Sequence, residues 1–327
     1  MTTPVPVARR GAPDSATLDR PDADPIDAAA TQPPSRLLAG ALSVLAGGLC
    51  WSFTGVFIRL APHLDAWQFL VYRGLGVAVA FTLIARSRRR GAILPGFFAL
   101  GPLGVVAALA LSLAAIGFIV ALKLTNVANA LFLSSCAPLL SAILGFLILG
   151  ERLGVRQAGA TALGFCGLVI IVGGGFEAGG VVGDAWALVC ALSFAVVSVC
   201  MRLAPKRDFD PAMVAYGVFS ALAAAAVCLG EGATLAPPLM EALAAFAAGF
   251  VLIGLGFALF LRGAPTVPAV GQTLLAQTET IFGPIWVWLA FGETPAATTL
   301  AGGAVILTAV VAMALSGAAA PAPNVSN

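Results

Sequence analysis

The sequence predicts an all-α polytopic membrane protein, in which ten transmembrane helices form two inverted five-helix repeats. Of its 327 residues, 60% are hydrophobic and only 10% are charged, whereas about a quarter of the residues of a soluble domain are charged. The apolar residues gather in ten long segments, and two short motifs recur at nearly the same offset. A chain with so few polar residues cannot cover a soluble globule, which excludes a soluble enzyme.

Charge, cysteine and histidine content exclude several further classes. The formal net charge of +2 offers no field that would attract a nucleic acid. All six cysteines lie in apolar runs without CxxC spacing, so we expect neither a disulfide framework nor a zinc site. His63 is the single histidine, which leaves no His-based catalytic triad or metal cluster, and the chain lacks a phosphate-binding GxxxxGK motif. We therefore expect no cofactor.

The two ends of the chain differ in composition from the remainder. Residues 1–36 are rich in Pro, Asp, Ala and Arg and show no apolar period, which predicts a disordered tail. Residues 317–327 form a short polar tail. Everything between these tails is dominated by apolar segments.

Ten segments are long and apolar enough to cross a bilayer, which requires about 20 residues as a helix. Strands of a membrane barrel would alternate apolar and polar residues. Runs such as 105–122 do not alternate, so the spans are predicted to be helices. In chain order, the predicted spans are 38–60, 66–85, 96–121, 126–149, 157–174, 184–204, 211–230, 239–261, 266–291 and 297–316.

The distribution of Lys and Arg predicts the orientation of these spans. Ten crossings place both termini on one side of the membrane. If that side is the cytoplasm, 14 of the 17 basic residues lie in cytoplasmic segments, as the positive-inside rule requires. We therefore expect a multi-pass protein of the cell inner membrane with both termini in the cytoplasm.

Two motifs recur between the halves of the chain. Residues 57–65 and 200–208 share Arg-Leu-Ala-Pro and a following Asp at an offset of 143. Residues 149–151 and 291–293 share Gly-Glu at an offset of 142. These matches predict a first repeat over 37–174 and a second over 183–316.

Five is an odd number of crossings, so the second repeat enters the membrane from the opposite face. Homologous five-helix units in one chain are then inverted relative to each other. Inverted repeats are typical of secondary transporters, in which near-equivalent halves expose a midplane site to alternate sides.

A set of features follows the chain in order: Trp51-Ser52 with Arg59, Arg73, Pro138 before residues 149–152, and Glu279 before residues 292–293. Their spacing resembles the drug/metabolite transporter superfamily, specifically the EamA-type permeases. The resemblance covers about residues 37–316 and implies export or uptake of small metabolites, often amino acids. The sequence departs from the family pattern at Thr280, where the family often has Pro, and at Tyr216, which replaces an Arg equivalent to Arg73.

Arg73 and Glu279 are the two ionisable residues expected well inside the predicted spans. Burying a charge in a bilayer costs about 2.5–3.5 kcal/mol on insertion scales, so such residues usually face a cavity or a partner. Glu279 is placed near the midplane as a proton or cationic-group acceptor, and Arg73 as a carboxylate anchor. Alternatively, the two form a buried ion pair, or Arg73 extends towards the interface.

Five further residues are predicted to bind the substrate. Gln272 lies on a polar face of the ninth span, and Asn129 lies in a matching polar stretch of the fourth; interhelical hydrogen bonding is the alternative for both. The aromatic side chains of Trp51 and Tyr72 would border an apolar pocket. Ser193 is expected as a contact from the sixth span.

These features predict a secondary transporter that moves amino acids or related small metabolites, with export as the expected direction. The alternative is a membrane-embedded enzyme or sensor without transport activity. The expected partners are a small-molecule substrate, the lipid bilayer and protons as the coupling ion, and a homodimer is compatible with the sequence. Nucleic acid is excluded as a partner.

Overall fold

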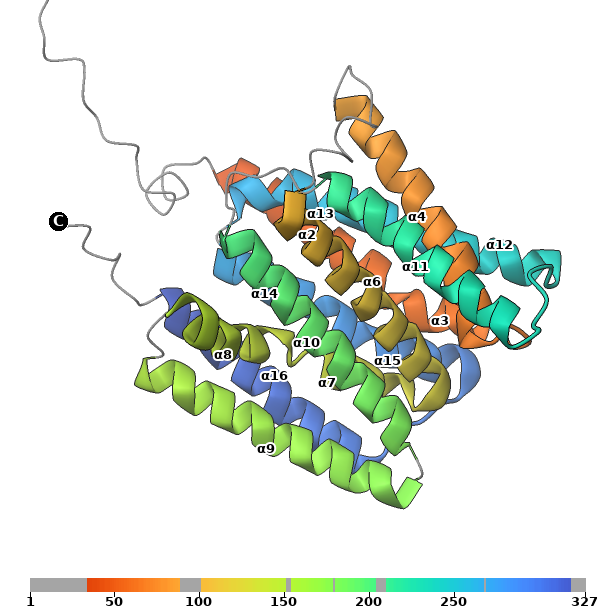
Figure 1. Ribbon diagram of the computed structural model, residues 1–327. Coiled ribbons are helices and arrows are strands. Elements are labelled where there is room, and N and C mark those ends of the chain that lie inside the picture. The colour runs from red at the N-terminus through yellow and green to blue at the C-terminus, as the bar shows by residue number, and fades with distance from the viewer. Residues whose placement is uncertain are drawn as a thin grey trace, which may run out of the picture.

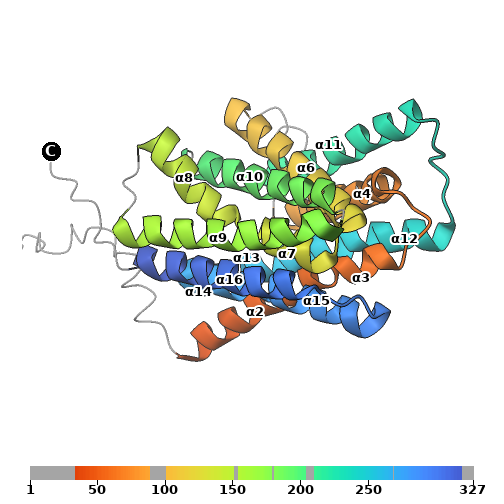
Figure 2. The same ribbon diagram turned by 90° about the horizontal axis from the view of Figure 1, so that it is seen from below.

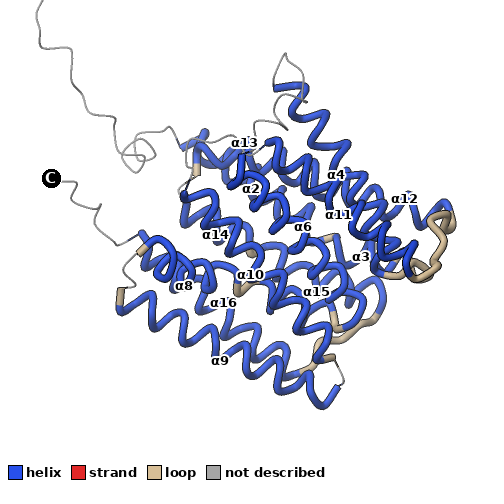
Figure 3. Tube along the Cα trace, viewed as in Figure 1, coloured by secondary structure: helices blue, strands red, loops and turns tan. Residues whose placement is uncertain are grey.

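The computed structural model consists of helices and their connections (Figure 3). Ten helical segments are long and apolar enough to cross a membrane, which confirms the predicted all-α polytopic fold. Most of the two predicted tails lies outside the described residues, although the first helix already begins at Pro34. The structure describes residues 34–88, 101–150, 154–178, 180–203, 210–267 and 269–318.

Four of the ten spans, the first, fourth, eighth and ninth, are assembled from more than one helical piece (Figure 1). The short 3₁₀ turn η3 (Ala264–Thr266) follows the eighth span. In chain order, the spans are α2 with α3 (Pro34–Ser52, Thr54–Arg59), α4 (Ala66–Arg88), α6 (Gly101–Leu124), α7 with α8 (Val127–Ser134, Ala137–Leu149), α9 (Val155–Ala178), α10 (Val181–Leu203), α11 (Asp210–Gly230), α12 with the π-helix η2 and α13 (Leu239–Ala247, Ala248–Leu255, Gly256–Gly263), α14 with α15 (Ala269–Ala276, Thr278–Phe291), and α16 (Ala297–Ala318).

The largest helix–helix interfaces all join one half of the chain to the other. The first span packs on the eighth, the second on the seventh, the third on the sixth and the fifth on the tenth. The α9–α16 pair is seen side by side in Figures 1 and 2. A two-fold operation that exchanges the halves maps each of these pairs onto another pair of the set or onto itself. The two repeats therefore interlock around a pseudo-two-fold axis.

The fourth and ninth spans are interrupted at equivalent positions. The fourth breaks at Ser135 and the ninth at Gln277, which are as far apart in sequence as Gly150 and Gly292. These two glycines end α8 and α15 in the left-handed conformation, with φ of 68° and 71°, which glycine adopts without steric cost. Interrupted helices at matching places in two inverted halves are typical of transporter binding sites, since the breaks free backbone groups.

Polar contacts join the halves at one end of the bundle, which we call the Arg59 end. Arg59 forms an ion pair of 2.9 Å with Glu293 and donates to the carbonyl of Leu122 at 3.0 Å. The other carboxylate oxygen of Glu293 accepts from the backbone N–H of Val127 at 2.7 Å. The pair thus links the end of the ninth span to three spans of the first half.

Replacing Glu293 with Ala is expected to destabilise the protein by about 2 kcal/mol, because the change removes a charge-assisted hydrogen bond and the acceptor for Val127. Thermal unfolding of the purified protein measures the loss. Glu231→Ala is the control, since this carboxylate is exposed at the same end of the bundle. Equal unfolding midpoints for Glu293→Ala and the unmodified protein would show that the ion pair contributes nothing.

Candidate functional site

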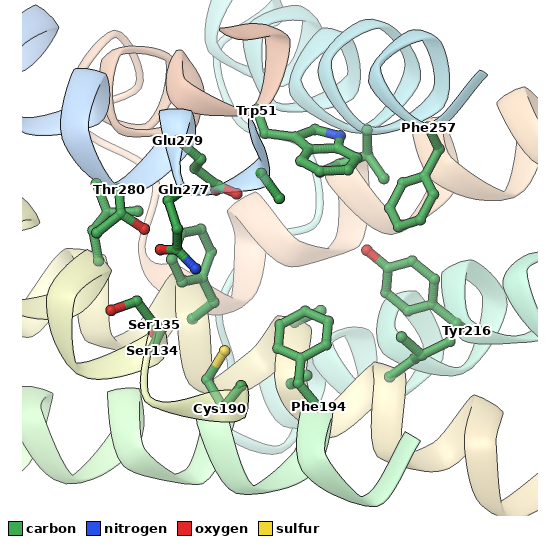
Figure 4. A pocket seen from close by; sticks show the side chains of 18 of the residues that line it. Trp51, Ser134, Ser135, Cys190, Phe194, Tyr216, Phe257, Gln277, Glu279 and Thr280 are labelled. Carbon is green, nitrogen blue, oxygen red and sulfur yellow. The ribbon is translucent and has the colours of Figure 1, made fainter. Parts of the chain in front are cut away.

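A cavity of about 300 Å³ lies between the two halves (Figure 4). Its wall contains residues from eight of the ten spans, and the described residues of α9 and α16 contribute none. Both helix breaks reach it, since Ser135 and Gln277 are lining residues. The cavity therefore lies where the interlocked repeats meet, and its volume is within the range of small-molecule sites.

Arg73, on α4, lines this cavity and is only 4% exposed. Its Nη1 donates to the hydroxyl of Tyr216 on α11 at 3.2 Å. Tyr216 follows Arg73 by 143 residues, the offset that relates the two repeats. Equivalent positions of two inverted halves lie close together only near the axis that relates them, so this hydrogen bond places Arg73 and Tyr216 near that axis.

Close packing between the backbones of η2 and α4 fixes the position of Arg73. Gly249 of η2 lies so near α4 that an added Cβ would be 2.0 Å from the carbonyl oxygen of Arg73. At Gly76, an added Cβ would be 2.2 Å from the carbonyl oxygen of Phe246. Small residues at these two positions let the helices approach this closely.

Glu279 lines the same cavity. It is the second residue of α15 and follows the break at Gln277 by two residues. None of the ion pairs among the described residues includes it, and Arg73 is not its direct partner. The structure thus brings the two predicted charges to one cavity without joining them in an ion pair. Each of the two remains available to a group of opposite charge.

An aromatic wall closes another side of the cavity. The ring of Trp51 lies 4.9 Å from that of Phe257 and 5.5 Å from that of Phe260, measured between centroids. The indole rests on the backbone of Gly256, where a Cβ would be 2.3 Å from its Nε1. Figure 4 shows Trp51 and Phe257 across the cavity from Phe194. This wall suits an apolar or aromatic portion of a ligand.

Buried polar atoms without a hydrogen-bond partner concentrate at this cavity. Five such side-chain atoms occur among the described residues, and four belong to residues that line it. Buried polar groups are nearly always paired, so an unpaired group calls for an explanation such as a ligand or water. The four atoms are Trp51 Nε1, Arg73 Nε, Ser134 Oγ and Gln277 Oε1.

The other predicted substrate contacts do not line this cavity. Tyr72 donates its hydroxyl to the carbonyl of Leu235, and Ser193 donates to Val189 of its own helix. Gln272 donates to the carbonyls of Ala264 and Val267, which ties α14 to the preceding turn.

Asn129 lines a second cavity of about 400 Å³, near the Arg59 end. Its side chain donates to Asp184 at 3.3 Å and accepts from Thr299 at 2.5 Å. Asn129 therefore forms interhelical hydrogen bonds, which was the alternative to substrate binding that the sequence offered.

Several lining residues were not predicted as substrate contacts. The repeat offset from Arg73 points to Tyr216, and Ser134 and Gln277 lie within the polar stretches of the fourth and ninth spans. Phe194 and Phe257 carry no sequence signal, because an aromatic residue in an apolar span is usual. Within the described ranges, no group of three or more His, Cys, Asp or Glu residues is placed to hold a metal ion.

Both halves of the chain resemble known proteins. Residues 38–173 and 181–315 match the model of the EamA-like transporter family. An uncharacterized transporter from Archaeoglobus fulgidus is 31% identical over 199 residues, which are 59% of this chain and 69% of that protein. A protein of known crystal structure aligns with a TM-score of 0.59 at 20% identity, over 85% of this chain and 97% of its own. At that identity, the structural likeness shows the fold alone.

Proposed function

The chain belongs to the EamA-like transporter family, and from this membership we propose that it is a secondary transporter that exports amino acids or related small metabolites. The family is one of transporters and not of enzymes, which removes the membrane-enzyme alternative. Transport would proceed by alternating access across the cell inner membrane, with both termini in the cytoplasm.

The observation that carries this proposal is that Arg73 and Glu279 share one cavity without pairing. Arg73 belongs to the first half and Glu279 to the second. A zwitterion would place its carboxylate on the guanidinium and its ammonium group on the carboxylate. The wall of Trp51 and Phe257 would then receive the side chain.

The interlocked repeats supply the means of alternating access. A substrate that contacts both Arg73 and Glu279 ties the halves together around the cavity, and the helix breaks at Ser135 and Gln277 are places where the spans can bend. Glu279 is also the proposed proton acceptor, since a carboxylate that exchanges its ammonium partner for a proton would couple transport to the proton gradient.

The first test is a thermal-unfolding screen of the purified protein against the amino acids and related metabolites. A ligand that binds the folded state raises the unfolding midpoint. Compounds that do so are then measured for flux in proteoliposomes, with and without a pH gradient. Stabilising ligands that are not transported, or transport of molecules without an ammonium or carboxylate group, would contradict the proposal.

A further inference from the structure

Tyr216 occupies the place in the second half that Arg73 occupies in the first, and it lines the substrate cavity. It is 5% exposed, and Figure 4 shows its hydroxyl pointing into the cavity. The hydroxyl oxygen accepts a hydrogen bond from Nη1 of Arg73 at 3.2 Å. In the described part of the chain the hydroxyl forms no further hydrogen bond, so its own proton remains available to a ligand.

The backbones of α4 and α11 cross closely beside this pair. A Cβ added at Gly74 would lie 2.7 Å from the carbonyl oxygen of Gly217, and one added at Gly217 would lie 2.9 Å from that of Gly74. These glycines directly follow Arg73 and Tyr216 in the two halves. The hydroxyl of Ser112 on α6 also donates to the backbone carbonyl of Tyr216 at 3.2 Å. The phenol of Tyr216 is therefore held beside the guanidinium of Arg73.

The guanidinium of Arg73 keeps unused donors beside this hydroxyl. Nη1 is its one nitrogen with a hydrogen bond among the described residues. Nε is enclosed without a partner, whereas Nη2, which is also unpaired, is not one of the enclosed atoms. A carboxylate has two acceptor oxygens, so it can accept from Nη2 with one and from the hydroxyl of Tyr216 with the other.

The two halves differ in charge at both pairs of equivalent positions in the cavity. Tyr216 replaces the arginine of the first half, and Ala137 lies where the second half has Glu279. The described lining residues thus include one cation and one anion, whose charges cancel. A ligand with a net charge would leave that charge uncompensated between apolar walls, which is costly.

We propose that Tyr216 is a specificity-determining residue, whose hydroxyl donates to the substrate carboxylate beside Arg73 and adds no charge to the cavity. An arginine in its place would give the cavity a net positive charge and favour anions. The inference rests on the proposed function. It adds that the preferred substrates carry one carboxylate and one ammonium group, and that dicarboxylates are rejected.

Binding of four six-carbon probes to the purified full-length protein tests this role by isothermal titration. L-Norleucine carries a carboxylate and an ammonium group, hexanoate and hexylamine carry one of these each, and adipate carries two carboxylates. We expect L-norleucine to bind most tightly and adipate not to bind. Tyr216→Phe should weaken L-norleucine binding about tenfold, through the loss of one hydrogen bond to a charged group. Its affinity for hexylamine, which has no carboxylate, should stay unchanged.

Tyr72→Phe is the matched control, because the hydroxyl of Tyr72 donates to the carbonyl of Leu235 and does not line the cavity. This variant should bind L-norleucine like the unmodified protein. Tyr216→Arg adds a positive charge and should raise the affinity for adipate relative to L-norleucine about tenfold. Tyr216→Phe keeps the test decisive if Tyr216→Arg does not fold.

Equal affinities of Tyr216→Phe and the unmodified protein for L-norleucine would overturn the proposal. So would an equal loss of hexylamine binding in that variant, adipate binding as tight as that of L-norleucine in the unmodified protein, or binding of none of the four probes. Flux in proteoliposomes separates this role from the proposed function. L-Norleucine that binds as expected but is not transported overturns the function alone, and equal transport by Tyr216→Phe and the unmodified protein overturns the role of Tyr216 alone.

Discussion

Glu279→Gln and Arg73→Ala are each expected to slow substrate flux in proteoliposomes by about tenfold to a hundredfold. In the proposed mode of binding, each change would remove one charge-assisted hydrogen bond to the substrate, worth about 1.5–3 kcal/mol, and a factor of ten corresponds to about 1.4 kcal/mol. The two side chains line one cavity and do not pair with each other. Removing one of these side chains therefore does not break an ion pair with the other.

The Glu279 variant also tests the coupling ion. If Glu279 accepts the proton, a pH gradient accelerates flux by the unmodified protein and leaves the residual flux of Glu279→Gln unchanged. Glu231→Gln, which neutralises an exposed carboxylate, should transport normally. Normal flux by both Glu279→Gln and Arg73→Ala, at equal expression, would show that the substrate binds elsewhere.

Gly249→Ala is expected to reduce both transport and stability, although it places no atom in the cavity. The added Cβ would lie 2.0 Å from the carbonyl oxygen of Arg73, which is backbone and cannot rotate away. Either η2 or α4 must move, and overpacking of this kind costs about 1–3 kcal/mol. The movement carries Arg73 away from Tyr216, so flux should fall together with the thermal unfolding midpoint.

Gly159→Ala provides the matched control for this steric effect. Nothing lies within 4 Å of a Cβ added at Gly159, which is on the exposed side of α9. Alanine favours a helix by about 1 kcal/mol over glycine, so this variant should be at least as stable as the unmodified protein. If Gly249→Ala behaves like Gly159→Ala, the close crossing of η2 and α4 does not position Arg73.

Local composition was sufficient to predict the helical bundle. Apolar length predicts each span because a bilayer requires about 20 residues to cross, and this requirement is met within each segment separately. The positions of Arg73 and Glu279 were predicted for the same reason, since charges are rare in such segments. Both side chains line the cavity between the halves.

Partners from distant segments were harder to predict. Tyr72, Gln272 and Ser193 have polar side chains like those of true lining residues, but each is satisfied by a backbone carbonyl. Whether a hydroxyl or amide faces a cavity depends on the rotation of its helix and on the carbonyls that neighbouring segments bring near. Neither quantity is encoded in the spacing of residues along one span.

The ten spans, the two repeats and the scarcity of charge within the membrane could all be predicted from the sequence, because each depends on residues counted along the chain. The packing of distant segments places Arg73 against Tyr216 and leaves Glu279 without an ion-pair partner among the described residues. Those outcomes depend on which helices of the opposite half pack against each residue. These contacts form where the two inverted repeats interlock, and the residue pattern within a single segment does not predict them.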